Sequence, residues 1–134
     1  MAIKVSIITP ESIIWNNNAE KIVLPTTRGK ICVMSNHSPL IISLDIGITL
    51  IYTKKKNHSF LVVGGFALIK NNNITLLVNE AKMRKFLDFS NIEKLFQRTK
   101  NKLKSIKSDK ERLSLLLQYK YLKAQYLLFK QKNF

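Results

Sequence analysis

Residues 73–106 read NITLLVNEAKMRKFLDFSNIEKLFQRTKNKLKSI, and the hydrophobic residues change their spacing within this stretch. The run 74–78 is short, apolar and typical of a strand. Further along, apolar residues recur every three or four positions, at Ile92, Leu95, Phe96, Leu103 and Ile106. That recurrence places them on one face of a helix. The stretch therefore predicts an all-β part before it and a helical part after it.

The chain before residue 82 alternates short apolar runs with turn residues. All four glycines and all three prolines precede residue 66, and turns select these residue types. We place nine strands at 3–8, 13–15, 20–24, 31–34, 40–43, 48–53, 59–63, 66–69 and 74–78. Their spacing is typical of a sandwich or barrel. Asn16-Asn17-Asn18 is interpreted as a turn, and Gly64-Gly65 as a strand break or bulge with a close backbone approach.

The helical part divides into two helices. Asp88 or Ser90 is expected to cap the first, and Ser108 with Glu111 fits a capping box that starts the second. The second helix carries an apolar stripe of Leu113, Leu116, Leu117, Tyr121, Ala124 and Leu128. A short polar link between two such helices predicts an antiparallel hairpin.

Basic charge is concentrated in the helical part. The chain has a net charge of +15, and fifteen of its Lys and Arg residues follow residue 81 against four acidic residues there. Such a surface suits nucleic acid, an anionic membrane or an acidic protein. A coding bias towards A- and T-rich codons, which specify lysine and asparagine, would also account for part of this charge. The helical spacing of Tyr119, Tyr121, Tyr126 and Phe129 favours packing within the hairpin over stacking on bases.

Catalytic and metal-binding patterns are missing from the sequence. The two histidines, single cysteine and eight carboxylates are scattered, so we expect no catalytic, metal or cofactor site. His37 with Asp45 is one candidate for a base oriented by a carboxylate, but a loop histidine that contributes a hydrogen bond or an interface contact is favoured. Cys32 is expected to be a small packed residue.

Four segments in order carry a resemblance to a known family. They are Leu24-Pro25-Thr26 to Gly29, Asn36-His37-Ser38-Pro39-Leu40, Leu44-Asp45-Ile46-Gly47-Ile48 and Gly64-Gly65-Phe66-Ala67. Together with the strand 73–78 and a following hairpin, they resemble the epsilon subunit of the F-type, proton-translocating ATP synthase. The resemblance implies a flattened β-sandwich of about ten strands over residues 1–84 and a two-helix antiparallel hairpin over 85–134.

The resemblance also implies a role. Epsilon subunits are non-catalytic parts of the central stalk that link the gamma subunit to the membrane ring of proton-carrying subunits and restrain ATP hydrolysis. The family's ring contact falls on the turn that here holds Arg28, Gly29 and Lys30. Other members often have acidic residues there, so we expect a compensated charge on the ring loops. We also expect His37 and Pro39 to contact the rotor and gamma.

The helices of the family can extend towards acidic loops of the catalytic beta subunits. The residues expected to make these contacts here are Arg112, Lys120, Lys123 and Lys130. Some bacterial members bind ATP through an Asp-x-x-Arg-Ala motif, but Asp88 is followed three residues later by Asn91. The arginine that would pair with phosphate is absent, so we expect no bound ATP.

The resemblance also implies a location in the cell. Trp15 after Ile13-Ile14, with no presequence, is similar to the plastid-encoded branch, which implies the stromal side of the thylakoid membrane. Membrane association would then come only through the complex. A bacterial inner membrane is the alternative location.

A basic nucleic-acid-binding module on a sandwich scaffold is the alternative function, and a small-molecule-binding sandwich is a third.

Overall fold

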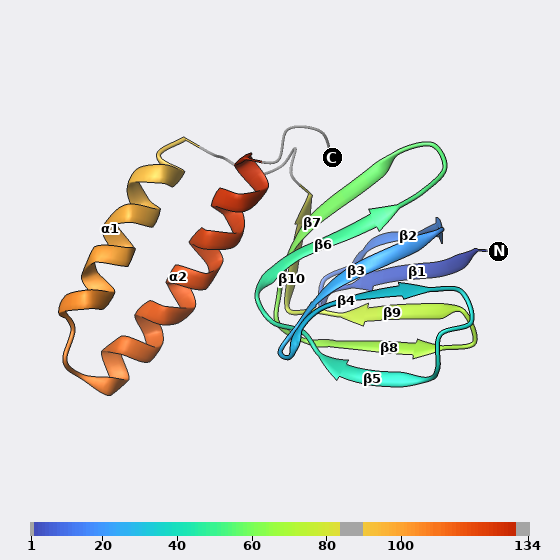
Figure 1. Cartoon of the computed structure of the whole chain (residues 1–134), viewed down its shortest axis with the longest axis horizontal. Coiled ribbons are helices and arrows are strands. Elements are labelled where there is room, and N and C mark those ends of the chain that lie inside the picture. The colour runs from blue at the N-terminus through green and yellow to red at the C-terminus, as the bar shows by residue number, and fades with distance from the viewer. Residues whose placement is uncertain (1, 84–89, 131–134) are drawn as a thin grey trace.

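A computed structural model describes residues 2–83 and 90–130, which form a two-sheet β-sandwich and a helical hairpin (Figure 1). The first sheet, sheet A, contains β1 (Ile3–Ile8), β2 (Ile13–Ala19), β5 (Leu40–Ser43), β8 (Phe66–Lys70) and β9 (Asn73–Leu77). Sheet B contains β3 (Lys21–Thr26), β4 (Gly29–Met34), β6 (Gly47–Tyr52), β7 (Asn57–Val63) and β10 (Glu80–Met83). The expected fold class is confirmed. The expected domain boundary at 84/85 and the cap at Asp88 lie outside the described residues.

Alternating side chains build the core between the sheets. In β1 the odd-numbered residues Ile3, Val5 and Ile7 are buried while Lys4 is exposed, as the period of a strand requires. The same alternation in other strands brings their apolar residues into one cluster. Its fully buried members are Val5, Ile7, Ile22, Leu24, Val33, Ile51, Phe60, Val62, Ala67 and Leu76.

The strand connections define two ends of the sandwich. Sheet A has the order β2-β1-β9-β8-β5 and sheet B the order β10-β7-β6-β3-β4, with β1 parallel to β9. The end near the hairpin, here called the proximal end, holds the connections 9–12, 27–28, 44–46, 64–65 and 78–79. The distal end holds residue 20 and the connections 35–39, 53–56 and 71–72 (Figure 1).

Three features differ from the sequence-based expectation. Asn16 to Asn18 are not a turn, because β2 continues to Ala19 and pairs with β1 throughout; polar residues are tolerated there because β2 is an edge strand with an exposed face. The tenth strand, β10, was not placed by pattern, since four residues alone give too little alternation. Cys32 is exposed, because β4 turns it to the outer face of sheet B.

The close backbone approach expected at Gly64-Gly65 is confirmed. The chain passes here from β7 in sheet B to β8 in sheet A, and Gly65 has a φ of 110°. A Cβ on Gly65 would lie 2.0 Å from the carbonyl oxygen of Leu77. The Gly65 carbonyl also accepts a hydrogen bond from the Leu44 amide at 2.8 Å. Gly65 thereby ties the proximal ends of β5, β8 and β9 together.

We predict that Gly65→Ala strongly destabilises the sandwich. The left-handed φ alone costs about 1–3 kcal/mol for a residue with a Cβ, and the backbone clash adds to it. Gly29→Ala is the matched control, because Gly29 has a similar φ of 112° but nothing within 4 Å of its would-be Cβ. Urea unfolding of both variants measures the difference. Equal losses would contradict the importance of the Leu77 contact.

The hairpin consists of α1 (Ile92–Ser105) and α2 (Asp109–Lys130), which run antiparallel (Figure 1). α1 has Asn91 as its N-cap residue rather than Ser90, and α2 begins directly after Ser108 as predicted. The Phe96 ring of α1 stacks on two rings of α2, at 5.4 Å from Tyr119 and 5.0 Å from Tyr126. These two tyrosines therefore pack within the hairpin, as expected from their spacing.

Candidate functional site

The hairpin docks on sheet B through a small apolar cluster. Leu128 and Ala124 of α2 are buried against Leu61 of β7, with Ile48 and Tyr121 packed around them. The α2 helix faces β6 and β7 across this contact, whereas α1 lies on the far side of α2 (Figure 1). The cluster is separate from the main core between the sheets. Few side chains therefore hold the hairpin on the sandwich.

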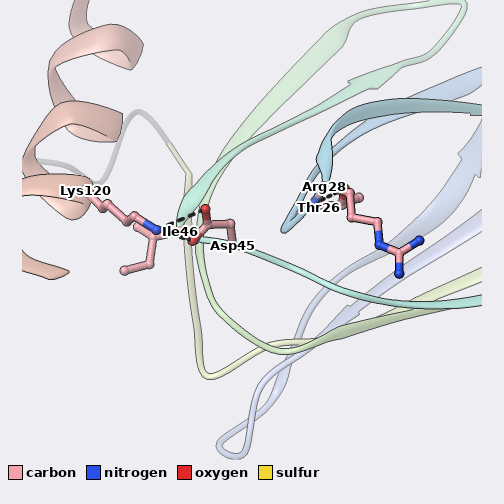
Figure 2. Close-up of polar contacts among 5 residues, drawn as sticks. All are labelled: Thr26, Arg28, Asp45, Ile46 and Lys120. Atoms are coloured by element: carbon pink, nitrogen blue, oxygen red, sulfur yellow. Dashed lines mark hydrogen bonds and ion pairs between the residues drawn. The ribbon is translucent and has the colours of Figure 1, made fainter. Parts of the chain in front are cut away.

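One ion pair joins α2 to the proximal end. The Lys120 Nζ lies 3.4 Å from the Asp45 carboxylate, and the Asp45 Oδ1 also accepts the Ile46 amide at 2.9 Å (Figure 2). Both charged side chains are more than a third exposed, at 41% and 38%. An ion pair as exposed as this contributes about 0–1 kcal/mol. It orients the hairpin more than it stabilises the docked position.

A groove of about 260 Å³ lies beside this ion pair, between the sandwich and α2. Its wall includes Pro25 and Gly47, and Lys30 and Lys123 line it together with Lys120. Asp45 is the one acidic residue among these lining residues. On β10, the Lys82 pKa is raised by a side-chain hydrogen bond to Glu80 and, to a lesser degree, by Tyr121 of α2. The docked surface therefore carries an excess of positive charge.

The residues expected to contact the ring lie at the proximal end. Arg28 lies on the turn between β3 and β4, Gly29 and Lys30 are the first residues of β4, and all three are exposed. The Thr26 hydroxyl donates a hydrogen bond to the Gly29 carbonyl and accepts one from the Arg28 amide at 3.2 Å. The Arg28 side chain points away from α2 (Figure 2). Arg28 thus extends away from the hairpin, whereas Lys30 lines the groove under α2.

His37 and Pro39 lie at the distal end, in the connection from β4 to β5. The structure therefore separates them from the Arg28 turn by the length of the sandwich. The His37 Nδ1 lies 2.6 Å from the Ser38 carbonyl oxygen. Because Asp45 belongs to the proximal end, it cannot orient His37 as a base.

The other cations expected to act on the hairpin are exposed on α2. Arg112 lies in the first turn, and Lys123 faces the groove. The Lys130 Nζ lies 5.4 Å above the Tyr126 ring. Lys120 already has an intramolecular partner, which sequence spacing could not reveal. Much of the expected apolar stripe is exposed: Leu113 is 62% exposed, Leu117 51% and Leu116 38%.

Sheet A also carries an exposed apolar surface that the sequence patterns did not predict. Four residues lie side by side across the outer face, because Phe66 pairs with Leu77, Leu77 with Ile8, and Ile8 with Ile13. Phe66 is 53% exposed and Ile13 63% exposed. We call Phe66, Leu77, Ile8 and Ile13 the apolar row. Alternation within each strand could have suggested its members, but only the register aligns them.

Residues 2–83 and 90–130 contain no group of three or more His, Cys, Asp or Glu side chains placed to hold a metal ion. No helix among them is both long and apolar enough to cross a membrane.

Comparison with known proteins identifies the family. Residues 2–84 match the ATP synthase delta/epsilon chain β-sandwich domain. The plastid ATP synthase epsilon chain of Prototheca wickerhamii is 47% identical over 98% of both chains. The chain belongs to the ATP synthase delta/epsilon family. The chloroplastic epsilon chain of Chlorella vulgaris is 40% identical over 98% of both chains, so the expected epsilon type and plastid location are confirmed.

Solved structures show the same fold in distant relatives. A chain of the Euglena gracilis mitochondrial ATP synthase matches 96% of this epsilon-type chain and 81% of its own length, with a TM-score of 0.85 at 17% identity. A chain of the Tetrahymena thermophila ATP synthase central stalk and c-ring structure matches 95% and 96%, with a TM-score of 0.66 at 14% identity. As an ATP synthase epsilon subunit, this chain is a non-catalytic component of its complex.

We predict that Leu128→Ala releases the hairpin from sheet B while the sandwich stays folded. Leu128 is fully buried in the docking cluster, and truncating such a leucine costs about 2–5 kcal/mol. Leu113→Ala is the matched control, since Leu113 is 62% exposed and does not line the groove between α2 and the sandwich. Amide hydrogen exchange should accelerate across 109–130 in the first variant only. Protection of α2 that is equal in both variants would show that this cluster does not hold the hairpin.

Proposed function

We propose that this chain couples the gamma subunit to the proton-carrying ring in the central stalk and restrains ATP hydrolysis through its hairpin. The observation that carries the proposal is the contrast between a large sandwich core and a small docking cluster under α2. Family membership and the likeness to a chain of the Tetrahymena central stalk support the placement in the stalk. The plastid and chloroplast relatives support a position on the stromal side of the thylakoid membrane.

The hairpin has the properties of an arm with two positions. In the docked position it buries Ala124 and Leu128 but leaves Leu113, Leu116 and Leu117 exposed. An undocked position would lose the docking cluster and gain burial of these leucines against another subunit. Lys120 would then exchange Asp45 for an acidic loop of a beta subunit, alongside Arg112, Lys123 and Lys130. A change of partner for Lys120 costs little, because exposed ion pairs differ by about 1 kcal/mol or less.

The apolar row on sheet A is our choice for the gamma contact. It lies on the face of the sandwich that α2 does not cover, since α2 packs on β6 and β7 of sheet B. Ile41 and Pro39 extend the same surface towards the distal end, and both are exposed. Exposed apolar surface of this kind marks interaction sites on proteins. This placement agrees with the expected role of Pro39.

The turn at 28–30 is our choice for the ring contact. Arg28 and Lys30 are exposed there, and their charge requires acidic or neutral partners on the ring loops. A nucleic-acid role for the hairpin has less support, since two of the tyrosines that would stack on bases are packed against Phe96.

Deleting residues 88–134 is the experiment that tests the inhibitory role. The deletion should raise ATP hydrolysis by the assembled complex and leave assembly intact, because the sandwich core does not include the hairpin. Hydrolysis is measured on the purified complex with gamma present. Unchanged hydrolysis after clean deletion would remove the restraining function.

A crosslink identifies which hairpin position restrains hydrolysis. Asp45→Cys with Lys120→Cys, joined by a short bis-maleimide, holds the hairpin docked; Cys32→Ser is needed in the background because Cys32 is exposed. The crosslinked complex should hydrolyse ATP as fast as the deletion variant. Slower hydrolysis would show that the docked hairpin is itself the inhibitory form.

We predict that Phe66→Gln weakens binding to gamma about tenfold or more. Burial of a large apolar side chain contributes about 1.5–3 kcal/mol, which corresponds to at least about tenfold in affinity. Met34→Gln is the matched control, because Met34 is 57% exposed but lies on sheet B. Pull-down of gamma with immobilised chain gives the affinities. Equal binding by both variants would move the gamma contact away from the apolar row.

A further inference from the structure

The charges of the sandwich are divided between its two ends. The distal end carries six lysines, Lys4, Lys21, Lys54, Lys55, Lys56 and Lys70, against one acidic residue, Glu20. The proximal end of the sandwich carries Arg28, Lys30 and Lys82 against Glu11, Asp45 and Glu80, and Lys82 pairs with Glu80 at 3.0 Å. Residues 1–81 contain eight Lys and Arg residues and four acidic residues, and this moderate net charge of +4 averages the two ends. The distal end is the strongly basic surface of the sandwich.

A groove of about 850 Å³ opens at this end. Both sheets and the turn between β6 and β7 contribute to its wall. The lining side chains with polar or charged groups are Asn17, Asn18, Glu20, Ser35, Thr53, Lys54, Lys55, Lys56 and His58. Within the described part of the chain, no acidic group lies within ion-pair distance of the three consecutive lysines. Their charge is therefore available to a partner.

Two hydrogen bonds stabilise the turn that carries the lysines. The Thr53 hydroxyl accepts the Lys56 amide at 3.0 Å and donates a hydrogen bond to the Lys56 carbonyl. These two bonds close the turn at its base. Little backbone entropy is then lost when the lysines bind a partner.

An edge strand borders the same groove. β2 pairs only with β1 among the described strands, and its last residues, Asn17 to Ala19, line the groove. At the groove the Asn18 amide of this edge donates to the Asn17 Oδ1 at 2.8 Å, so an extended peptide that adds as a further strand would replace this side-chain contact with its own backbone. A lipid headgroup or a phosphate ion would not use this edge.

We propose that the distal groove binds an extended acidic segment of a partner protein, with Lys54, Lys55 and Lys56 contacting its carboxylates and the β2 edge pairing with its backbone. The groove shares no lining residue with the proximal groove under α2. It is also distinct from the turn at 28–30 and from the apolar row. The distal groove is therefore a further binding surface, separate from those that we propose for coupling gamma to the ring and for restraining ATP hydrolysis.

His58 and Trp15 supply built-in reporters of occupancy. Their rings lie 5.4 Å apart, and Trp15 is the single tryptophan of the chain. Desolvation lowers the His58 pKa below 6.5, and the positive charge of Lys56 lowers it further. Lys54, Lys55 and Glu20 are the other charged groups that line the groove with it. Carboxylates bound beside Lys56 favour the imidazolium and should raise the His58 pKa.

Binding of a hexaglutamate peptide to the full-length chain tests the proposal. At low salt we expect a change in Trp15 fluorescence, an upward shift of the His58 titration followed by NMR, and weaker binding as salt is added. Lys54→Gln, Lys55→Gln and Lys56→Gln together should weaken binding about tenfold or more. The control carries Lys100→Gln, Lys102→Gln and Lys104→Gln, which remove the same charge from exposed positions of α1 and should leave binding within about twofold.

Other outcomes overturn the proposal. Equal weakening by the two triple variants would show that only total charge matters. Binding to inorganic phosphate, or to vesicles of phosphatidylcholine and phosphatidylglycerol in equal parts, without binding of hexaglutamate would assign the groove to a phosphate or a lipid surface. No binding of hexaglutamate at low salt would leave the groove without the proposed occupant. None of these results bears on ATP hydrolysis or gamma binding, so the two proposals fail separately.

Discussion

The backbone contact between Gly65 and Leu77 is the constraint on which the rest of the arrangement depends. At this point the chain leaves sheet B and enters sheet A, and only a residue without a Cβ fits between the strands. The Gly65 carbonyl then holds the Leu44 amide, which leads directly into Asp45. The position of Asp45 in turn determines where Lys120 of α2 can form its ion pair with the sandwich. A steric requirement inside the sandwich thus reaches the surface that receives the hairpin.

Unequal stability is the physical basis of the proposed switch. Among residues 2–83 and 90–130, the core between the sheets includes most of the buried apolar residues, whereas the docking cluster buries Leu61 of β7 with Ala124 and Leu128 of α2. The ion pair beside them is exposed enough to be screened by salt. The hairpin can leave its surface at a cost far below that of unfolding, because local opening and global unfolding draw on different contacts. A rigid body with a loosely held arm suits a subunit that turns with its neighbours and also regulates them.

Sequence patterns predicted the helices and strands better than the contacts between residues that are far apart in the sequence. The change of period near residue 80, the glycine pair and the start of α2 after Ser108 were all visible locally, and the structure confirms them. The turn predicted at Asn16 to Asn18 was wrong, because residue preference cannot show that these residues lie in an edge strand, which tolerates polar side chains. The partner of Lys120 and the distal basic end depend on residues far apart in the sequence. Such juxtapositions follow from topology, which local spacing does not encode.

The parallel pairing of β1 with β9 has a consequence for how the molecule is made. β1 is synthesised first, but one of its two neighbours in sheet A does not exist until residue 77 has been added. Closing that pair requires a long loop, which makes it a late and slow event in folding. The hairpin follows the sandwich in the chain and leaves the ribosome after it. The surface on β6 and β7 that receives α2 is therefore already translated when α2 is made.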